Sequence, residues 1–348
     1  MTFYKYMKLG LLGCFATILA ALSHPAIAQS QEGVEANKGR LGILSARSSD
    51  THAAVTADIA RVLDGKSGLR IVPYLGPGSV QNIDDVLGFR HADMALINSD
   101  AMTYRRLLEP NSDQLNNIFY IAQLFSLEMH LITRTDTGIS SISDLNGRRI
   151  ASGESKSGTF LTASLLLRSA GIRATAIALP IEDSLLELKD GTIDAVFYLG
   201  GRPSATLQKI SADEGLVLAN IPHSSAMASV YGRSELTSED YPTLVQDKFI
   251  ETVSVNVVLA MRGSPPAGSN EYTAIRSFVS EFIRNSAQFQ RPPSHPKWAN
   301  FSFETEIDGW ERSPIVLDVL AGKEPEVQEQ ATIEDLMLQV IEENNSNN

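Results

Sequence analysis

The chain has 348 residues and a formal net charge of −12, from 41 acidic and 29 basic side chains. This balance argues against nucleic acid and anionic lipid as main partners, because both repel an acidic surface. The length is enough to bury a large core and favours two lobes over one. The single cysteine, Cys14, lies near the N-terminus, so the rest of the chain cannot depend on disulfides.

The N-terminal residues have the pattern of a secretory signal. Two lysines precede an apolar run over residues 9–22, and a small-x-small pattern ends at Ala28. The run is short for a membrane-spanning helix, so we predict a signal peptide over residues 1–28, cleaved after Ala28. The sequence around Cys14 also resembles a lipoprotein processing box, which leaves lipidation there as an alternative. An exported, acidic chain without cysteine fits a bacterial periplasm.

After this signal, short apolar strands alternate with helices. The first such unit has a strand, a polar loop, a helix with apolar residues at helical spacing, and a second strand. Gly76, Pro77 and Gly78 then turn the chain, and Ser79 can cap a second helix. The predicted order is strand 41–44, helix 51–63, strand 69–75, helix 80–87 and strand 94–98.

A second segment repeats this order. It is predicted as strand 149–152, loop 153–158, helix 159–170, strand 175–179, helix 180–189 and strand 195–199. Each segment is a β-loop-α-β-α-β unit, which predicts an α/β fold with mainly parallel sheets and helices on both faces. Ligands of such sheets bind beyond the carboxyl ends of the strands. Two such units facing each other would enclose a ligand between their loops.

The remaining segments predict how the two lobes are connected. The strand over residues 129–134 leads from the first unit toward the second, and the β-rich run 253–261 can lead back. Two such strands would form a hinge. We therefore predict one lobe from residues 38–128 plus 253–341 and the other from residues 129–252. Further expectations are a helix near 272–284, a helix starting near Ile333, and a disordered tail over 342–348.

Several stretches resemble the TAXI subgroup of solute receptors for TRAP (tripartite ATP-independent periplasmic) transporters. They are GPGSVQNIDDVLGFRHADMALINSD (76–100), MHLITR (129–134), SISDLNGRRI (141–150), ASGESKSGTF (151–160) and LKDGTIDAVFYLGGRP (188–203). The combined match covers roughly residues 40–265. The loop 45–52 departs from it, because it lacks the glycines and the Tyr-Tyr-Pro-like run usual in that family. The resemblance implies a two-lobed, periplasmic-binding-protein-like fold (type II-like) with a two-strand hinge.

The resemblance also implies a function. It indicates a periplasmic receptor that captures a small organic acid or amino acid between two lobes and delivers it to the TRAP membrane permease. TRAP systems use an ion gradient, so this subunit would need no nucleotide or other cofactor. Two alternatives stay open, namely the solute receptor of an ABC importer and a ligand-sensing protein that serves a membrane sensor.

The candidate site lies at the loops that enter helices. Ser157, Gly158 and Thr159 open a helix whose backbone N–H groups can bind a carboxylate, although Ser157 can also serve only as a cap. Ser48, Ser49 and Thr51 hold the equivalent place in the first unit, with the same alternative. The other candidates are Gly78 and Ser79 at a helix start, Ser99 after a strand, Tyr198, Gly201, and the cations Arg47 and Arg202.

The charges in these loops leave the charge of the ligand open. The candidate loops contain the acidic residues Asp50, Asp100 and Glu154. They also contain the basic residues Arg47, Lys156 and Arg202. Catalysis has no support, because no G-x-S-x-G motif occurs and the S-x-x-K match over residues 294–297 lies among prolines. The six histidines lack zinc spacing. We predict a binding protein with no catalytic residue and no metal.

Overall fold

The computed structural model describes residues 37–48, 50–89, 91–307, 309–324 and 337. The predicted signal peptide, the helix expected near Ile333, the tail over 342–348 and the candidate Ser49 lie outside these residues. None of the described helices is long and apolar enough to cross a membrane.

The first βα unit forms as predicted, and no boundary of its predicted elements differs by more than one residue. Its elements are β1 (Arg40–Leu44), α3 (Thr51–Leu63), η1 (Lys66–Gly68), β2 (Arg70–Tyr74), α4 (Ser79–Gly88) and β3 (Met94–Asn98). Two helices that the sequence patterns did not predict follow, α5 (Ser99–Leu108) and α6 (Asp113–Asn116). Ser99, predicted to follow the strand directly, is the first residue of α5.

The second βα unit also forms. Its elements are β5 (Arg149–Ala151), α7 (Gly158–Ser169), β6 (Thr175–Ile177), α8 (Ile181–Lys189) and β7 (Ala195–Gly200). The short helices η2 (Thr135–Thr137) and η3 (Ile142–Leu145) precede it. The segments after it are η4 (Leu207–Lys209), η5 (Ala212–Glu214), β8 (Leu216–Ala219), η6 (Ser225–Met227), β9 (Gly232–Thr237) and β10 (Phe249–Arg262). The chain continues through α9 (Asn270–Arg284), α10 (Ser286–Phe289), η7 (Pro296–Asn300) and α11 (Pro314–Leu320).

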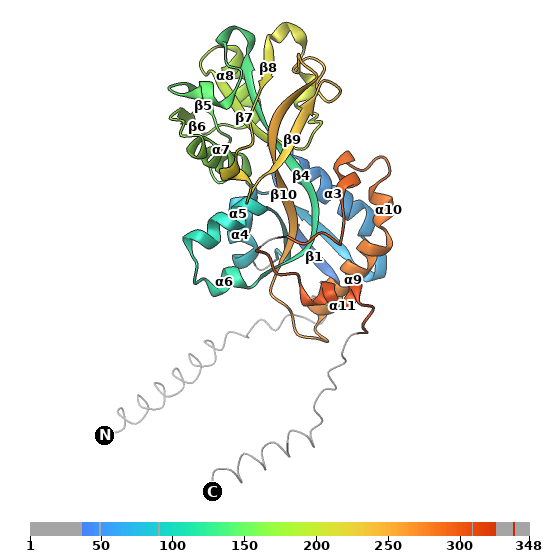
Figure 1. Cartoon of the computed structure of the whole chain (residues 1–348). Helices are drawn as coiled ribbons and strands as arrows, with labels where there is room; N and C mark the ends of the chain where they lie inside the picture. The colour runs from blue at the N-terminus through green and yellow to red at the C-terminus, as the bar shows by residue number, and fades with distance from the viewer. Residues whose placement is uncertain (1–36, 49, 90, 308, 325–336, 338–348) are drawn as a thin grey trace, which may run out of the picture. The chain divides into compact units, whose positions relative to one another are not determined.

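Two long strands join the βα units. The strand order is β2-β1-β3-β10-β4-β7-β5-β6, with parallel pairing inside each unit and antiparallel pairing at β10 and at β4 (Ile118–Arg134). β4 pairs with β10 up to Glu128 and with β7 from Glu128 onward. β10 changes partner from β9 to β4 at Ser254. Figure 1 shows β4 and β10 running side by side from the region of β1 toward β7 and β8.

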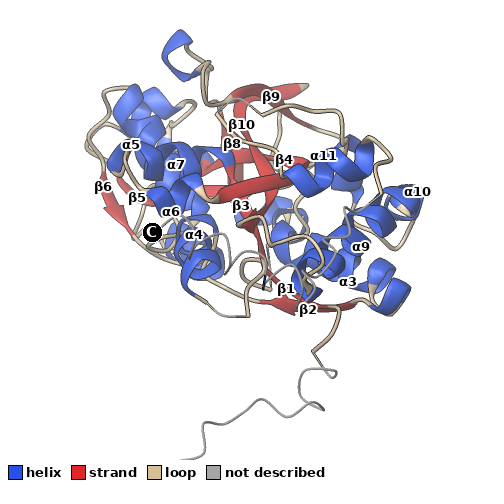
Figure 2. Ribbon diagram, turned by 90° about the horizontal axis from the view of Figure 1, so that it is seen from below, coloured by secondary structure: helices blue, strands red, loops and turns tan. Residues whose placement is uncertain are grey.

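Alternating side chains of the strands face two layers of helices. Met94 and Leu96 of β3 join a cluster with α3 and α9, whereas Ala95 and Ile97 join a cluster with α4 and α5. A β-strand directs successive side chains to opposite faces, so an all-apolar strand requires helices on both sides. Figure 2 shows α4 and α9 on opposite sides of β3.

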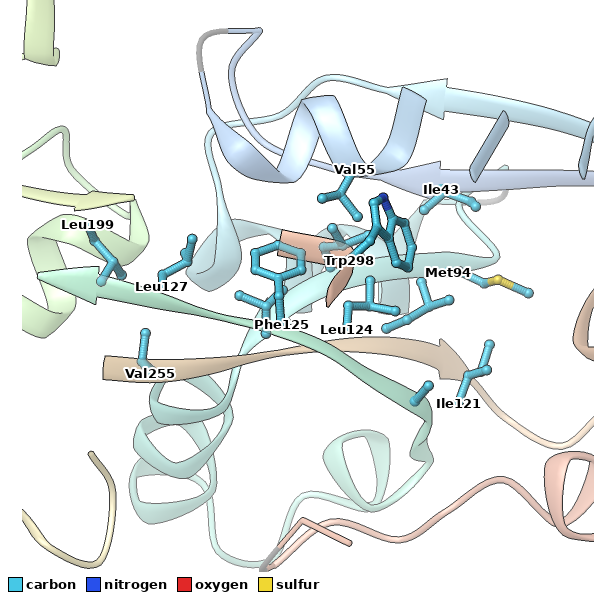
Figure 3. Packing of buried hydrophobic residues seen from close by; sticks show 14 of the residues in the cluster. Ile43, Val55, Met94, Ile121, Leu124, Phe125, Leu127, Leu199, Val255 and Trp298 are labelled. Carbon is cyan, nitrogen blue, oxygen red and sulfur yellow. The ribbon is translucent and has the colours of Figure 1, made fainter. Parts of the chain in front are cut away.

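The main hydrophobic core continues from the first unit into the second. It contains Ile43 and Val55 from the first unit, Leu124 of β4, and Leu199 of β7. Figure 3 shows Leu199 near one end of the drawn group and Ile121 near the other. The cluster follows β4, the strand that both units share.

Candidate functional site

The start of α7 is a capped helix N-terminus, as the sequence predicted. Ser157 is the N-cap residue, and its hydroxyl accepts a hydrogen bond from the Phe160 N–H at 3.1 Å. The Thr159 hydroxyl accepts another from the Leu199 N–H, at 3.2 Å, which ties the helix to the end of β7. Capping at this position typically contributes about 1 kcal/mol. Both side chains also line a cavity, so the cap and the candidate site share one loop.

That cavity lies between loops of the first and second βα units and has a volume of about 40 Å³. Its lining residues are Arg47, Asp50, Pro77, Gly153, Glu154, Ser157, Thr159, Leu179, Pro180, Ile181, Glu182, Phe197 and Tyr198. An adjoining hollow of about 630 Å³ shares Arg47, Pro77, Glu154 and Glu182 with it. Small-molecule sites usually measure ~300–1,000 Å³, so this cavity alone is small for a ligand.

An ion pair connects the two units at the edge of this cavity. Arg47, from the loop after β1, pairs with Glu154, from the loop after β5, through both carboxylate oxygens. Arg47 was predicted to hold a ligand carboxylate, and in this structure a protein carboxylate takes that place. Lys156 makes a second polar contact between the units by donating to the Gln81 side chain at 2.9 Å.

The predicted residues Thr51 and Gly201 contact each other instead of facing the cavity. The Thr51 hydroxyl accepts a hydrogen bond from the Gly201 N–H at 3.0 Å. A Cβ added at Gly201 would lie 3.0 Å from the same hydroxyl and 3.1 Å from Lys297 side-chain carbons. Glycine thus permits the close approach of the loop after β7 to the start of α3.

A buried polar group around Asn98 connects the end of β3 to the starts of α3 and α4, and the start of α7 lies against it. The Asn98 side-chain oxygen bonds to the His52 ring at 3.0 Å, and the Asn98 N–H donates to the Ser79 hydroxyl at 3.0 Å. A Cβ at Gly158 would lie only 2.5 Å from the Asn98 amide nitrogen. Burial lowers the pKa of His52 to about 4, so the ring is neutral at physiological pH.

Asp100 makes a further buried connection to α7. Its carboxylate accepts hydrogen bonds from the Thr162 hydroxyl at 2.6 Å and the Tyr231 hydroxyl at 3.1 Å. Burial raises the pKa of Asp100 to about 6, although both hydrogen bonds act in the opposite direction. Asp100 is 1% exposed, so solvent screens its charge little.

The raised pKa of Asp100 predicts that its contribution to the free energy of unfolding depends on pH. The folded-state pKa of about 6 lies above the ordinary value of ~3.9, so the folded protein loses stability as the pH rises through this window. Asp100→Asn cannot titrate. The free energy of unfolding of the variant minus that of the wild type is therefore expected to rise by about 2 kcal/mol from pH 4 to pH 7. Urea unfolding at several pH values measures this difference.

The difference between the two proteins is the informative quantity. Burial lowers the pKa of His52 and of His130 to about 4, and these groups favour the folded state increasingly as the pH rises. They are common to both proteins and cancel in the comparison. A difference that stays constant over this pH range would show that Asp100 does not titrate as described.

Arg202, the second predicted cation, lies outside the cavity lining. Its guanidinium donates to Asp240 at 3.2 Å, and its N–H donates to Glu128 at 2.9 Å. Glu128 also receives two hydrogen bonds from the Lys297 ammonium, at 2.6 and 2.7 Å, with both side chains buried. Arg202, whose side chain is 36% exposed, therefore lies at the edge of a charge cluster around the buried Glu128, at the point where β4 changes partner.

Residues 43–270 match the model of the NMT1-like family. The chain belongs to the NMT1-like family. The match runs from within β1 to the start of α9, and it includes the strands β4 and β10 that join the two βα units.

Solved structures with a similar arrangement have low sequence identity to this NMT1-like chain. One is the periplasmic VFT2 domain of BvgS from Bordetella pertussis, with 15% identity, coverage of 79% of this chain and 97% of that one, and a TM-score of 0.43. Another is the amino acid ABC transporter substrate-binding protein AbpA from Streptococcus pneumoniae, bound to L-arginine. It has 13% identity, coverage of 74% of this chain and 94% of that one, and a TM-score of 0.42. A third is the periplasmic sulfonate-binding protein SsuA from Methylobacillus flagellatus. It has 13% identity, coverage of 73% of this chain and 69% of that one, and a TM-score of 0.41.

Only part of the predicted site of this NMT1-like protein lines the cavity. Arg47, Ser157, Thr159 and Tyr198 line it, and Ser48 lines the adjoining hollow. The predicted residues outside the two linings are Thr51, Gly78, Ser79, Ser99, Gly158, Gly201 and Arg202. Gly78 lies against the start of α7, with a Cβ position 3.5 Å from the Ser157 Cα.

Three lining carboxylates were not among the predicted binding residues, although Asp50 and Glu154 were noted as charges of the candidate loops. Asp50 is the N-cap residue of α3, Glu182 lies in the first turn of α8, and Glu154 precedes α7. Acidic residues are common at helix N-termini because they complement the helix dipole, so the sequence alone does not distinguish them from capping residues. In the described part of the chain, no group of three His, Cys, Asp or Glu side chains is arranged to hold a metal.

Proposed function

We propose that this protein is a periplasmic solute-binding receptor that encloses a small organic acid or amino acid between two lobes. One lobe comprises residues 38–128 plus 253–341, and the other residues 129–252. The observation that carries the proposal is the cavity, because its lining comes from loops of both βα units. These loops stand at the carboxyl ends of the strands and at helix starts, where α/β proteins bind ligands.

The two connecting strands support a hinge between these lobes. β4 changes partner at Glu128 and β10 changes partner at Ser254. These two residues are paired with each other, so both strands change partner at the same level of the sheet. Hinge closure needs few such connections. We propose that the lobes open and close about this level and that the ion pair of Arg47 and Glu154 belongs to the closed form.

The delivery step is proposed from the sequence motifs. The stretches 151–160 and 188–203, which resemble TAXI receptors of TRAP transporters, include the cavity-lining residues Ser157, Thr159 and Tyr198. We propose that the closed receptor docks on a TRAP permease after export by a signal peptide cleaved after Ala28. The proposal includes no catalytic step and no cofactor. A neighbouring gene for an ABC permease or for a sensor kinase would instead favour one of the other two receptor classes.

A thermal-shift panel tests the capture step. The panel contains dicarboxylates, keto acids and amino acids, each added to the exported chain. A ligand that binds only the folded state stabilises it by about 2.7 kcal/mol at a concentration of 100 Kd. At least one member is expected to raise the Tm by several degrees. A panel in which no compound raises the Tm would reject a small acid or amino acid as the ligand.

A further inference from the structure

The described lining of the cavity is rich in negative charge. It contains the carboxylates of Asp50, Glu154 and Glu182 and a single basic side chain, that of Arg47. A ligand carboxylate is best held by an arginine, because the guanidinium can donate two parallel hydrogen bonds to it. The state of Arg47 therefore decides which ligand charge this cavity accepts.

Arg47 is already paired with a carboxylate. Its Nη2 donates to Glu154 Oε1, and its Nε lies next to Oε2 of the same side chain. This is the two-point contact that a ligand carboxylate would make. Without Arg47, the polar groups available to an acidic ligand are mainly those at the start of α7 beside Ser157 and Thr159.

We propose that Glu154 is a specificity-determining residue that excludes dicarboxylates by occupying Arg47. The cavity then favours a ligand with one carboxylate, held at the start of α7, and one ammonium group, held by Asp50 and Glu182. The inference rests on the proposed function and deepens it, because it selects amino acids over diacids within the proposed ligand class. Specificity of this kind depends on the contact denied to the wrong ligand as much as on contacts with the right one.

The environment of Asp50 supports this selection. Burial, the largest cause, and the nearby charges of Glu182 and Glu154 together raise the pKa of Asp50 to about 6. The N–H and the guanidinium of Arg47 oppose this effect. The same negative charges would repel a second carboxylate of a ligand, whereas they would attract an ammonium group.

The test compares two classes of ligand on two proteins. Isothermal titration gives the Kd of succinate and glutarate, as diacids, and of L-alanine and L-glutamine, as amino acids. Wild type is expected to bind the better amino acid at least about tenfold more tightly than the better diacid. Glu154→Gln keeps the size of the side chain, removes its charge and frees Arg47. This variant is expected to bind the diacids at least about tenfold more tightly than wild type does.

Asp183→Asn is the matched control, because it removes one negative charge from the exposed first turn of α8 outside the cavity lining. It should leave the ratio of the two affinities unchanged. The Tm of each variant without ligand shows whether it is folded, and Glu154→Ala serves as a second variant. A preference of wild type for diacids, or an unchanged ratio in both Glu154 variants, would overturn the inference and leave the receptor function standing. If none of the four compounds binds to any of the proteins, the inference is overturned, and the wider panel then decides whether the receptor function is rejected with it.

Discussion

Replacing Lys297 with methionine is expected to lower the free energy of unfolding by about 3–5 kcal/mol. The Lys297 ammonium and the Glu128 carboxylate form a buried ion pair, with side chains 4% and 5% exposed. Methionine fills a similar volume but leaves Glu128 buried without its main cation. Glu128 also accepts the Arg202 N–H, so the variant is expected to disturb the loop that carries Gly201 to Thr51. Urea unfolding measures the loss.

Two further variants show whether the loss comes from an unpaired buried charge. Lys323→Met breaks an exposed ion pair with Asp318 and is expected to cost less than about 1 kcal/mol. The double variant of Lys297→Met and Glu128→Gln is expected to be more stable than the single Lys297 variant, because it removes the isolated charge. A loss below about 1 kcal/mol for Lys297→Met alone would contradict this description of the cluster.

Replacing Gly158 with valine is expected to weaken ligand binding at least about tenfold, which corresponds to ~1.4 kcal/mol. A Cβ at this position would lie 2.5 Å from the Asn98 amide nitrogen. Asn98 cannot turn aside freely, because its oxygen bonds to His52 and the residue is 1% exposed. The start of α7 must therefore move away from β3, and this movement separates the two sides of the cavity. Titration with the best ligand of the panel gives the change in Kd.

Gly88→Ala is the matched control for this prediction. Gly88 ends α4, and a Cβ there has no atom within 4 Å. Its substitution is expected to leave the Kd unchanged within about twofold. Equal Kd values for Gly158→Val and wild type would mean that binding does not need the contact between Asn98 and α7.

The elements of the two βα units could be predicted because each carries its own local signal. Apolar runs mark the strands, and cap residues such as Ser79 and Ser157 mark helix starts, without reference to the rest of the chain. The full length of β4 was not predicted: only residues 129–134 of Ile118–Arg134 were identified as a strand. β4 is long because it takes β10 and then β7 as partner, and partners distant in sequence leave no local pattern.

In the candidate site, too, features with a local sequence signal could be predicted, and features that depend on partners distant in sequence could not. The start of α7 follows from residues that are neighbours in sequence, and its place at the cavity was predicted. The pairing of Arg47 with Glu154, which lies 107 residues away, and of Glu128 with Lys297, 169 residues away, depends on the folded arrangement. The arginine expected to bind a ligand is for this reason bound to the protein itself. Lys297 appeared in the sequence only as part of a coincidental S-x-x-K match.

The most direct test of the receptor proposal is a crystal structure of the protein with the best ligand of the panel. The ligand is expected in the cavity beside Thr159 and Tyr198, in contact with residues from both βα units. If that ligand is an amino acid, its ammonium group is expected near Asp50. A separate hollow of about 610 Å³ is lined by Glu128, Arg202 and Lys297 among others. Ligand density in this hollow, with the cavity beside Thr159 empty, would contradict the proposed site between the two βα units.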